Sequence, residues 1–422
     1  MRAAARSVVA NGGRLMGVNW IETALAAVYF AVMARCLGPA LYGHWAYGVA
    51  AYVLVVGLLG FGFDPLTLLR FGRDKPAAGD FVGLMLTLRL MLLGLGAVGL
   101  ALYALVAEPD PLGRTVLLLL VPAAIGRGVA TTVRICFLAY ERMADYARFA
   151  ALFRGAEAVC GIAYLAAGGG LVGVVMLHSL LWGGEAAFGL WQVRARLTRY
   201  ALRFAWRPAK GLLADGAILG LAMASYTCLT SGPIMILRHT PVGMAELGRF
   251  AIVSSLTLIL VGSVQAFLAA VLPVLSRSAP GADIGIAYGR IAALAVAGVA
   301  AAAALVAWLF GPSVVALALG ARYAVAGRLL APFALIGGAA LAPTAYAQVL
   351  LVANRRWPLA LADLAGALCL LAALAPAVAA WGLDGAVLAT AAAWLVRAAV
   401  LIGCGEADGA RALRRVATPG RA

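Results

Sequence analysis

Long apolar segments recur along this chain, and short polar connections separate them. About 20 helical residues cross a hydrocarbon core of roughly 30 Å, so each segment is long enough to span a membrane. Lipid cannot hydrogen-bond a backbone, and unbroken apolar runs favour helices over a closed barrel. The pattern predicts about 12 membrane-spanning helices, near residues 15–34, 46–63, 81–105, 114–138, 146–167, 171–193, 211–237, 246–273, 288–310, 328–353, 357–380 and 384–404.

The most basic stretch of the chain lies between the sixth and seventh of these segments. Its cationic residues recur every three or four positions, which predicts one stripe of an amphipathic helix on anionic headgroups: Arg196, Arg199, Arg203, Arg207 and Lys210. A docking or gating site for a lipid-linked substrate is the alternative role. Because this stretch divides the chain, we expect an N-terminal six-helix lobe over residues 1–205 and a C-terminal six-helix lobe over residues 206–422.

The charged residues refine this picture because most of them lie between the apolar segments. Only 12% of the residues are charged and 64% are hydrophobic, so we expect an all-α integral membrane protein. The net charge of +16 comes from Lys and Arg that are concentrated in alternate connections, which predicts that these connections and both termini are cytoplasmic. Binding to nucleic acid is not expected from this distribution.

The cysteine and histidine patterns indicate neither a metal site nor an enzyme. The six cysteines are scattered without CxxC or Cys/His spacing, and the three histidines lie far apart in the sequence. A membrane saccharide polymerase or ligase is expected to carry a large extramembrane loop or a cluster of catalytic carboxylates and histidines. We therefore expect a protein that is not an enzyme and that needs no cofactor.

A short pattern recurs at the equivalent position of the two halves, as in transporters built from structural repeats. After the first apolar segment the chain reads LGPALYGHWA over residues 37–46, and after the seventh it reads VGMAELGRFA over residues 242–251. Both read as apolar, Gly, spacer, apolar, Gly, basic, aromatic and Ala. Chance similarity between Gly-rich turns is the alternative in a chain with 50 glycines.

These motifs resemble those of the O-antigen and polysaccharide flippases, which share the multidrug/oligosaccharidyl-lipid/polysaccharide (MOP) superfamily with multidrug and toxin extruders (MATE). The resemblance is carried by ARCLGPALYGHWAYG, LAYERM, VGMAELGRFA, LPVLSR, LALGARYAVAG and LVANRRWP. It implies two six-helix lobes, bendable first and seventh helices, alternating access and a multi-pass location in the bacterial cytoplasmic (inner) membrane. It also implies a lipid-linked oligosaccharide as substrate, with membrane lipids and polysaccharide-assembly proteins as partners.

Ionised side chains inside the apolar segments are the candidate binding residues, because a charge in lipid costs several kcal/mol unless it faces a cavity or a partner. Planar guanidinium groups bind a diphosphate through bidentate, charge-assisted hydrogen bonds. We therefore predict a cationic substrate-binding cavity formed by Arg127, Arg89, Arg134, Arg154 and Arg397. The alternative is an ion pair, such as Arg154 with Glu185, or contact with headgroups at the membrane surface, as for Arg134 and Arg397.

Acidic side chains in the apolar segments are candidates for coupling transport to H⁺ or Na⁺. Glu22 lies beside Asn19 in the first segment, where titration during an exchange cycle is one role and a structural ion pair is the other. Asp215 and Asp363 lie near predicted helix starts, where the helix dipole stabilises a carboxylate without any further role. These four residues are the predicted ion-coupling group.

The seventh apolar segment carries a polar run that ends in a proline. We predict a hinge or a polar cavity wall at Ser225, Thr227, Ser231 and Pro233. A bend at the proline would free backbone carbonyls that a cavity or a neighbouring helix must satisfy. Packing between helices is the alternative role of the hydroxyl groups.

Together these features favour an alternating-access flippase that moves a polyprenyl-diphosphate-linked oligosaccharide across the membrane for surface polysaccharide biosynthesis. An ion-coupled drug or cation exporter of the same fold is the main alternative. It requires an acidic, aromatic cavity, and the excess of arginine over carboxylate in the third to fifth segments argues against it. A membrane saccharide polymerase or ligase is the less favoured alternative.

Overall fold

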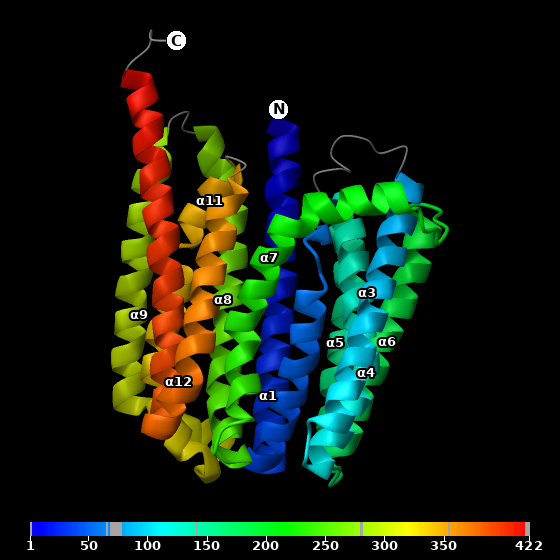
Figure 1. Ribbon diagram of the computed structural model, residues 1–422, viewed down its shortest axis with the longest axis vertical. Helices are drawn as coiled ribbons and strands as arrows, with labels where there is room; N and C mark the ends of the chain where they lie inside the picture. Colours follow the sequence, from blue (N-terminus) through cyan, green and yellow to red (C-terminus); the bar gives the residue numbers. More distant parts are fainter. Residues whose placement is uncertain are drawn as a thin grey trace. The chain divides into compact units, whose positions relative to one another are not determined.

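The computed structural model describes the side chains of residues 25–64, 66–67, 79–140, 142–262, 264–265, 289–348, 350 and 355–407, and the helical backbone alone at 2–24, 78, 263, 266–278, 282–288, 349, 351–352 and 408–417. Its elements (Figure 1) are α1 (Arg2–Leu58), α3 (Ala78–Val106), α4 (Pro111–Ala139), α5 (Met143–Ala166), α6 (Leu171–Arg196), α7 (Trp206–Leu237), α8 (Met244–Ser278), α9 (Ala282–Leu319), the 3₁₀ helix η1 (Ala321–Leu329), α10 (Leu330–Leu341), α11 (Thr344–Val352) and α12 (Arg356–Ala417). Within the described residues, 10 helical segments are long and apolar enough to cross a membrane. The predicted fold class, an all-α integral membrane protein, is confirmed.

Two of these segments are broken at a glycine with positive φ. The segment Arg356–Ala407 has 52 residues, which would extend about 78 Å as a straight helix. Gly382 (φ 57°) turns α12 back on itself, so that Arg397 and Asp363, 34 residues apart, are joined by a hydrogen bond of 2.6 Å. Gly38 (φ 76°) reverses α1 in the same way (Figure 1). Glycine enters this backbone region without steric cost. The predicted number of about 12 membrane-spanning helices stays a prediction.

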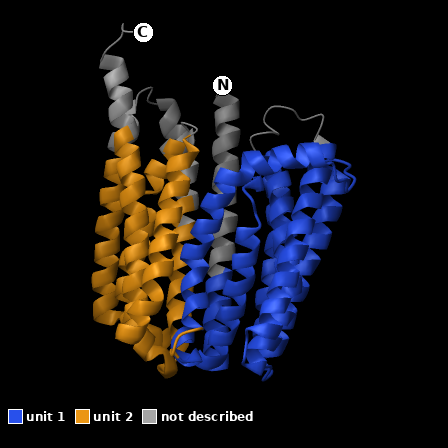
Figure 2. Ribbon diagram, in the orientation of Figure 1, with its two compact units in different colours: residues 1–238, 243–248 blue, residues 239–242, 249–422 orange. Residues whose placement is uncertain are grey.

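The chain forms two compact units (Figure 2). The first comprises residues 1–238 and 243–248, and the second comprises residues 239–242 and 249–422. The predicted lobe boundary between residues 205 and 206 precedes α7, whereas α7 packs on α1 inside the first unit. The division into six-helix lobes over 1–205 and 206–422 stays a prediction.

The first unit is held together by small residues and aromatic rings. α4 packs on both α3 and α6, and the approach to α6 is close at Gly126, where an added Cβ would lie 2.6 Å from the Trp182 carbonyl carbon. Phe137, Phe149 and Phe188 stack edge to face, with neighbouring centroids 5.7 and 5.5 Å apart. Close packing of this kind associates helices in lipid, because apolar side chains gain little there by leaving lipid for protein.

The second unit packs α10 against α9 and α12. Phe250 of α8 meets Phe333 of α10 edge to face, with centroids 5.2 Å apart. Leu359 and Leu401, one on each arm of α12, belong to one buried cluster with Leu350 of α11. The outer surface of α9 exposes large apolar side chains that suit contact with lipid, among them Leu294, Val299, Trp308 and Leu317.

The two copies of the repeated motif meet in the first unit. An added Cβ on Gly43 would lie 2.2 Å from the Met244 carbonyl oxygen, and one on Gly248 would lie 1.9 Å from the Pro39 carbonyl oxygen. Both motif glycines are therefore required by the same close approach of two backbones.

The basic residue after each motif glycine also has an equivalent contact. His44 Nε2 lies 2.7 Å from the Asp110 carboxylate in the connection between α3 and α4. Arg249 Nε donates a hydrogen bond of 3.4 Å to the Arg322 carbonyl oxygen in the connection between α9 and α10. The same motif position binds the corresponding connection in each half, which favours an internal repeat over chance similarity.

The predicted amphipathic helix over residues 196–210 is wrong, because the chain is not helical over residues 198–205. Residues of this non-helical stretch pack on α3: an added Cβ on Gly79 or Gly83 would lie 2.4 or 2.1 Å from the carbonyl oxygen of Arg199 or Ala201, respectively. Residues 198–205 thus contact the α3 backbone through these carbonyl groups and do not form a helix. α7 begins instead at Trp206, and its first turns run across the ends of the first-unit helices (Figure 1).

The predicted helix near residues 328–353 is also interrupted. Its beginning lies in η1, and a two-residue turn at Ala342 and Pro343 separates α10 from α11. Proline lacks the N–H group that would continue the hydrogen-bond ladder, and its ring clashes with the carbonyl of the residue four positions earlier.

Candidate functional site

A cavity of about 190 Å³ lies within the first unit, bounded by α1 and the turn after it, α3, α4 and α7. Its apolar wall includes Val53, Val56 and Met223. Three glycines at or just after the end of α1 also line the cavity: Gly57, Gly60 and Gly62. A Cβ added to Gly57 would lie 2.2 Å from the Thr227 hydroxyl, so this glycine permits the close approach of α7. The polar lining consists of Asp64, Arg89, Arg127, Thr131 and Thr227.

Arg89 enters the cavity lining from α3 as half of an ion pair. Its Nη1 donates a hydrogen bond of 2.6 Å to Asp64 Oδ1, and the Arg89 side chain is 2% exposed. The Nε atom of Arg89 is buried and has no hydrogen-bond partner in the described part of the chain. The carboxylate thus neutralises one of the two guanidinium groups at the cavity.

Arg127 of α4 is the second guanidinium at the cavity, and among the described residues it forms no salt bridge. Its Nη1 donates a hydrogen bond of 3.1 Å to the Tyr52 hydroxyl. Its Cζ lies 5.7 Å from the Tyr52 ring centroid and 5.4 Å from that of Trp182. Aromatic rings, rather than a carboxylate, therefore stabilise the positive charge of this guanidinium. With Asp64 counted against Arg89 and Arg127, the lining has a net charge of +1.

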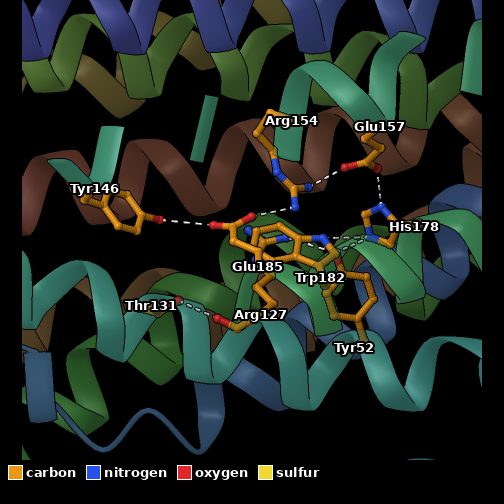
Figure 3. Close-up of polar contacts among 9 residues, drawn as sticks. All are labelled: Tyr52, Arg127, Thr131, Tyr146, Arg154, Glu157, His178, Trp182 and Glu185. Atoms are coloured by element: carbon orange, nitrogen blue, oxygen red, sulfur yellow. Dashed lines mark hydrogen bonds and ion pairs between the residues drawn. The ribbon is translucent and has the colours of Figure 1, made fainter. Parts of the chain in front are cut away.

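Behind Arg127, α5 and α6 carry a chain of ion pairs (Figure 3). Arg154 of α5 is bonded to Glu157 on its own helix and, at 2.7 Å, to Glu185 Oε2 on α6. The Tyr146 hydroxyl donates to the other oxygen of Glu185 at 3.3 Å. Both carboxylates are buried, and the Arg154 guanidinium also lies 3.8 Å from the Trp182 ring centroid. Arg154 is therefore an ion-paired residue and does not line the cavity.

His178 of α6 joins these ion pairs to the Tyr52 and Trp182 side chains (Figure 3). Its Nδ1 lies 2.5 Å from Glu157 Oε1, and its Nε2 lies 2.9 Å from the Tyr52 hydroxyl. Trp182 Nε1 donates a hydrogen bond of 3.1 Å to the same Nε2 atom. A continuous hydrogen-bond path thus connects Arg127 to Glu157 through one hydroxyl and one imidazole.

The remaining predicted cationic residues lie elsewhere. Arg134 is exposed on α4 and forms no hydrogen bond or ion pair within the described ranges. Arg397 belongs to the second unit, is 7% exposed and donates to Asp363 at 2.6 Å. Contact of Arg397 with headgroups, the alternative considered from sequence, is wrong because the side chain is buried inside the α12 hairpin. Of the five predicted arginines, the structure brings Arg127 and Arg89 to one cavity.

The predicted ion-coupling residues are not brought together in the described residues. Asp215 is exposed and Asp363 is paired with Arg397, and neither lies in the first turn of its helix, so the helix-dipole explanation is wrong for both. The side chains of Glu22 and Asn19 lie outside the described residues. A role of these four residues in ion coupling stays a prediction.

The polar run of α7 lies inside an uninterrupted helix. The residues Ser225, Thr227, Ser231 and Pro233 are buried, and the helix continues through Pro233 to Leu237, so a break at the proline is not seen. Thr227 borders the cavity, donates at 2.8 Å to the Met223 carbonyl oxygen and packs on Gly57. Each hydroxyl that bonds its own helix in this way needs no other partner.

A separate ion pair joins the end of α7 to the connection between α3 and α4. Arg238 Nε donates to Glu108 Oε2 at 3.2 Å and Nη2 donates to Oε1, and the Glu108 side chain is fully buried. Burial would raise the pKa of Glu108, but hydrogen bonds from Arg238 and Tyr47 hold that pKa below its usual value near 4.5. The same bond with Glu108 raises the pKa of Arg238.

Tyr52, His178 and Trp182 were not identified from the sequence as site residues. One signal was available: His178, Trp182 and Glu185 follow a spacing of four and three residues, which places them on one face of α6. Their partners come from α1, α4 and α5, and the sequence pattern does not reveal which faces of those helices meet α6. No group of three or more potential metal ligands occurs within the described ranges.

No protein-family model and no curated protein matches this sequence. An inward-facing multidrug resistance MATE family transporter of the MOP superfamily matches in structure with a TM-score of 0.73, 16% identity and coverage of 93% of this chain and 96% of that chain. An outward-facing transporter of the same family matches with a TM-score of 0.66, 16% identity and 96% coverage of each chain.

A MOP superfamily transporter from Pyrococcus furiosus also matches, with a TM-score of 0.65, 15% identity and 96% coverage of each chain. It is described as having a binding pocket whose reverse polarity suggests a different function. At these identities the comparisons concern the fold, and they extend over nearly the whole chain. The protein is therefore a multi-pass membrane protein with the fold of the MATE transporters of the MOP superfamily.

Proposed function

We propose that this protein is an alternating-access flippase that moves a polyprenyl-diphosphate-linked oligosaccharide across the bacterial cytoplasmic membrane. The MATE fold supports the transport part of this proposal, because solved proteins with this fold include inward-facing and outward-facing transporters. The flippase-like motifs favour a lipid-linked oligosaccharide as substrate. Coupling to H⁺ or Na⁺, cytoplasmic termini and contact with polysaccharide-assembly proteins belong to the same proposal.

The state of Arg127 at the cavity is the observation that supports this substrate class. Its guanidinium borders the cavity without a salt bridge in the described part of the chain, so an incoming anion does not have to displace a carboxylate from it. The planar guanidinium can donate two parallel hydrogen bonds to a phosphate, and these bonds strengthen where water is excluded. Glu157 and Glu185 remain bound to Arg154, behind the Trp182 ring.

Replacement of Arg127 tests this role. Arg127→Ala should reduce transport by at least tenfold at matched protein abundance, since a charge-assisted hydrogen bond contributes about 1.5 to 3 kcal/mol. Arg127→Lys should restore the charge without the bidentate geometry and give an intermediate rate. The measurement is the accumulation of lipid-linked saccharide on the cytoplasmic leaflet after depletion of the wild-type protein.

A surface arginine provides the matched control. The Arg148 side chain of α5 is 81% exposed, and its oxygen partner on Asp145 is 3.6 Å away. Arg148→Ala should therefore transport at the wild-type rate. Equal accumulation in the Arg127→Ala and Arg148→Ala strains would reject Arg127 as a substrate contact. Purified protein that elongates or transfers glycan by itself would replace the flippase proposal with an enzyme.

An exporter of drugs or other organic cations is the second candidate, since multidrug transporters share the fold. One observation favours it: Asp64 lies at the cavity, and its side chain is 21% exposed. Under this candidate, Asp64→Asn should abolish the efflux of a lipophilic cation from proteoliposomes, and Arg127→Ala should leave that efflux unchanged. The flippase proposal expects no cation efflux from either variant or from the wild-type protein.

A further inference from the structure

His178 is buried in the first unit, 6% exposed, and its ring contacts residues of α1, of α5 and of its own helix α6 (Figure 3). Tyr52 and Trp182, which bond its Nε2 atom, are also the two aromatic residues whose rings flank the Arg127 guanidinium. Trp45 of α1 adds an edge-to-face contact with the imidazole, with centroids 4.9 Å apart. A change in the protonation of His178 Nε2 therefore alters the hydrogen bonds of both aromatic residues that flank Arg127.

The hydrogen-bond partners of His178 assign its proton. The Trp182 indole N–H can only donate, so Nε2 must offer a lone pair to it. The Tyr52 oxygen accepts from Arg127 Nη1, which leaves the hydroxyl hydrogen to point at the same Nε2 atom. The proton of the neutral ring is then on Nδ1, where it is donated to the Glu157 carboxylate over 2.5 Å. His178 has one basic nitrogen, and that nitrogen faces two donors.

We propose that His178 Nε2 is a proton-binding site whose occupancy controls how tightly the Arg127 cavity holds an anion. This inference rests on the proposed role of Arg127 as an anion contact. A proton arriving at Nε2 turns this atom from an acceptor into a donor. Trp182 Nε1 then loses its acceptor, and the Tyr52 hydroxyl must accept from both His178 and Arg127.

The charges around the site set the direction of the effect. With His178 neutral, Arg127 and Arg154 balance Glu157 and Glu185. Protonation of His178 adds one positive charge that no further carboxylate in this group offsets. Repulsion between the imidazolium and the guanidinium, which then share the Tyr52 oxygen, favours a position of Arg127 toward the cavity, where an anion binds it. By linkage, a bound anion raises the affinity of the site for the proton by the same factor.

Every element that packs on His178 contributes charged or titratable groups. These are Tyr29 and Tyr52 from α1, Arg127 from α4, Tyr146, Arg154 and Glu157 from α5, and Glu185 from α6. Glu157 accepts from both His178 and Arg154, and Glu185 accepts from Arg154 and Tyr146. Among these groups the imidazole is the one whose unperturbed charge change falls near neutral pH.

Nitrogen NMR of ¹⁵N-histidine-labelled protein in lipid nanodiscs tests the site without any ligand. The chain has 3 histidines, and His178→Asn identifies the His178 signal while its amide still donates to Glu157. We expect a neutral ring protonated at Nδ1 at pH 8.5 that gains a second proton during titration to pH 5. Trp182→Phe removes the competing donor and should move the titration midpoint to higher pH. A proton on Nε2 at pH 8.5, or no titration in this range, overturns the inference.

Binding of farnesyl-diphosphoryl-glucose tests the coupling, because this diphosphate diester keeps a constant charge between pH 8.5 and 5.5. Wild-type affinity should increase on acidification by about 5- to 150-fold, the usual range for coupling between two sites. His178→Asn should bind with an affinity that does not change with pH. Wild-type binding that needs Arg127 and is independent of pH overturns the proton site and leaves the proposed function standing. Binding by Arg127→Ala that equals wild-type binding at every pH rejects the proposed function instead.

Discussion

The ion pair between Arg397 and Asp363 joins the two arms of α12, and we predict that removing one partner destabilises the protein more than removing both. The charged atoms are 2.6 Å apart, and the side chains are 8% and 11% exposed. At an effective dielectric constant of about 20, unit charges at 2.6 Å attract by about 6 kcal/mol. Desolvation of the two ions costs several kcal/mol each and offsets most of this attraction.

Single and double substitutions separate the attraction between the two charges from the cost of their desolvation. Arg397→Met leaves the Asp363 carboxylate buried without its partner, and Asp363→Leu does the same to the guanidinium. Each single change should therefore cost about 3 to 5 kcal/mol in the free energy of unfolding. The double variant removes both charges and keeps apolar volume beside Trp394, whose ring centroid lies 5.4 Å from the guanidinium carbon. It should cost less than either single change.

Reversible unfolding by SDS in mixed micelles, followed by circular dichroism, measures these free energies. Arg148→Ala is the control, because its exposed contact with Asp145 is worth at most about 1 kcal/mol. A double variant as unstable as the sum of the two single variants would refute the reasoning. If the double variant still transports lipid-linked saccharide, the role of the ion pair is structural. If the double variant has lost transport, Arg397 and Asp363 remain candidate site residues.

Two further predictions concern the first unit. The pKa of Glu108 is held below its usual value near 4.5 by its contact with Arg238, so the resulting stability is present above that pH and is lost as the pH falls through the folded-state pKa. The difference in SDS unfolding free energy between wild type and Glu108→Gln should shrink below pH 4.5, and a constant difference down to pH 3 would contradict this. Gly248→Ala should destabilise by about 1 to 3 kcal/mol, because its Cβ would lie 1.9 Å from the Pro39 carbonyl oxygen, whereas Gly99→Ala, at an exposed position of α3 where the added Cβ meets no neighbouring group within 4 Å, should not destabilise. Identical unfolding curves for these two glycine variants would show that the close approach is absent.

The interior arginines show what hydropathy can and cannot predict about a membrane protein. Arg89, Arg154 and Arg397 were identified because a charge inside an apolar run needs a partner or a cavity. Their partners are contributed by other segments: Asp64 lies 25 residues from Arg89, and Glu185 lies 31 residues from Arg154. Sequence spacing shows which face of a helix a side chain occupies. It does not show which helix that face meets.

The sequence by itself determined the helical fold, since lipid leaves helices as the way to satisfy the backbone of each long apolar run. It also placed connections after the first and the eleventh apolar segments, and in the structure Gly38 and Gly382 reverse the chain there with positive φ. Only the tertiary structure decided that Arg127 borders a cavity without forming a salt bridge of its own within the described residues, and that His178 connects it to Glu157. These contacts depend on how α1, α4, α5 and α6 are rotated against one another, and side-chain packing sets that rotation after the helices have formed.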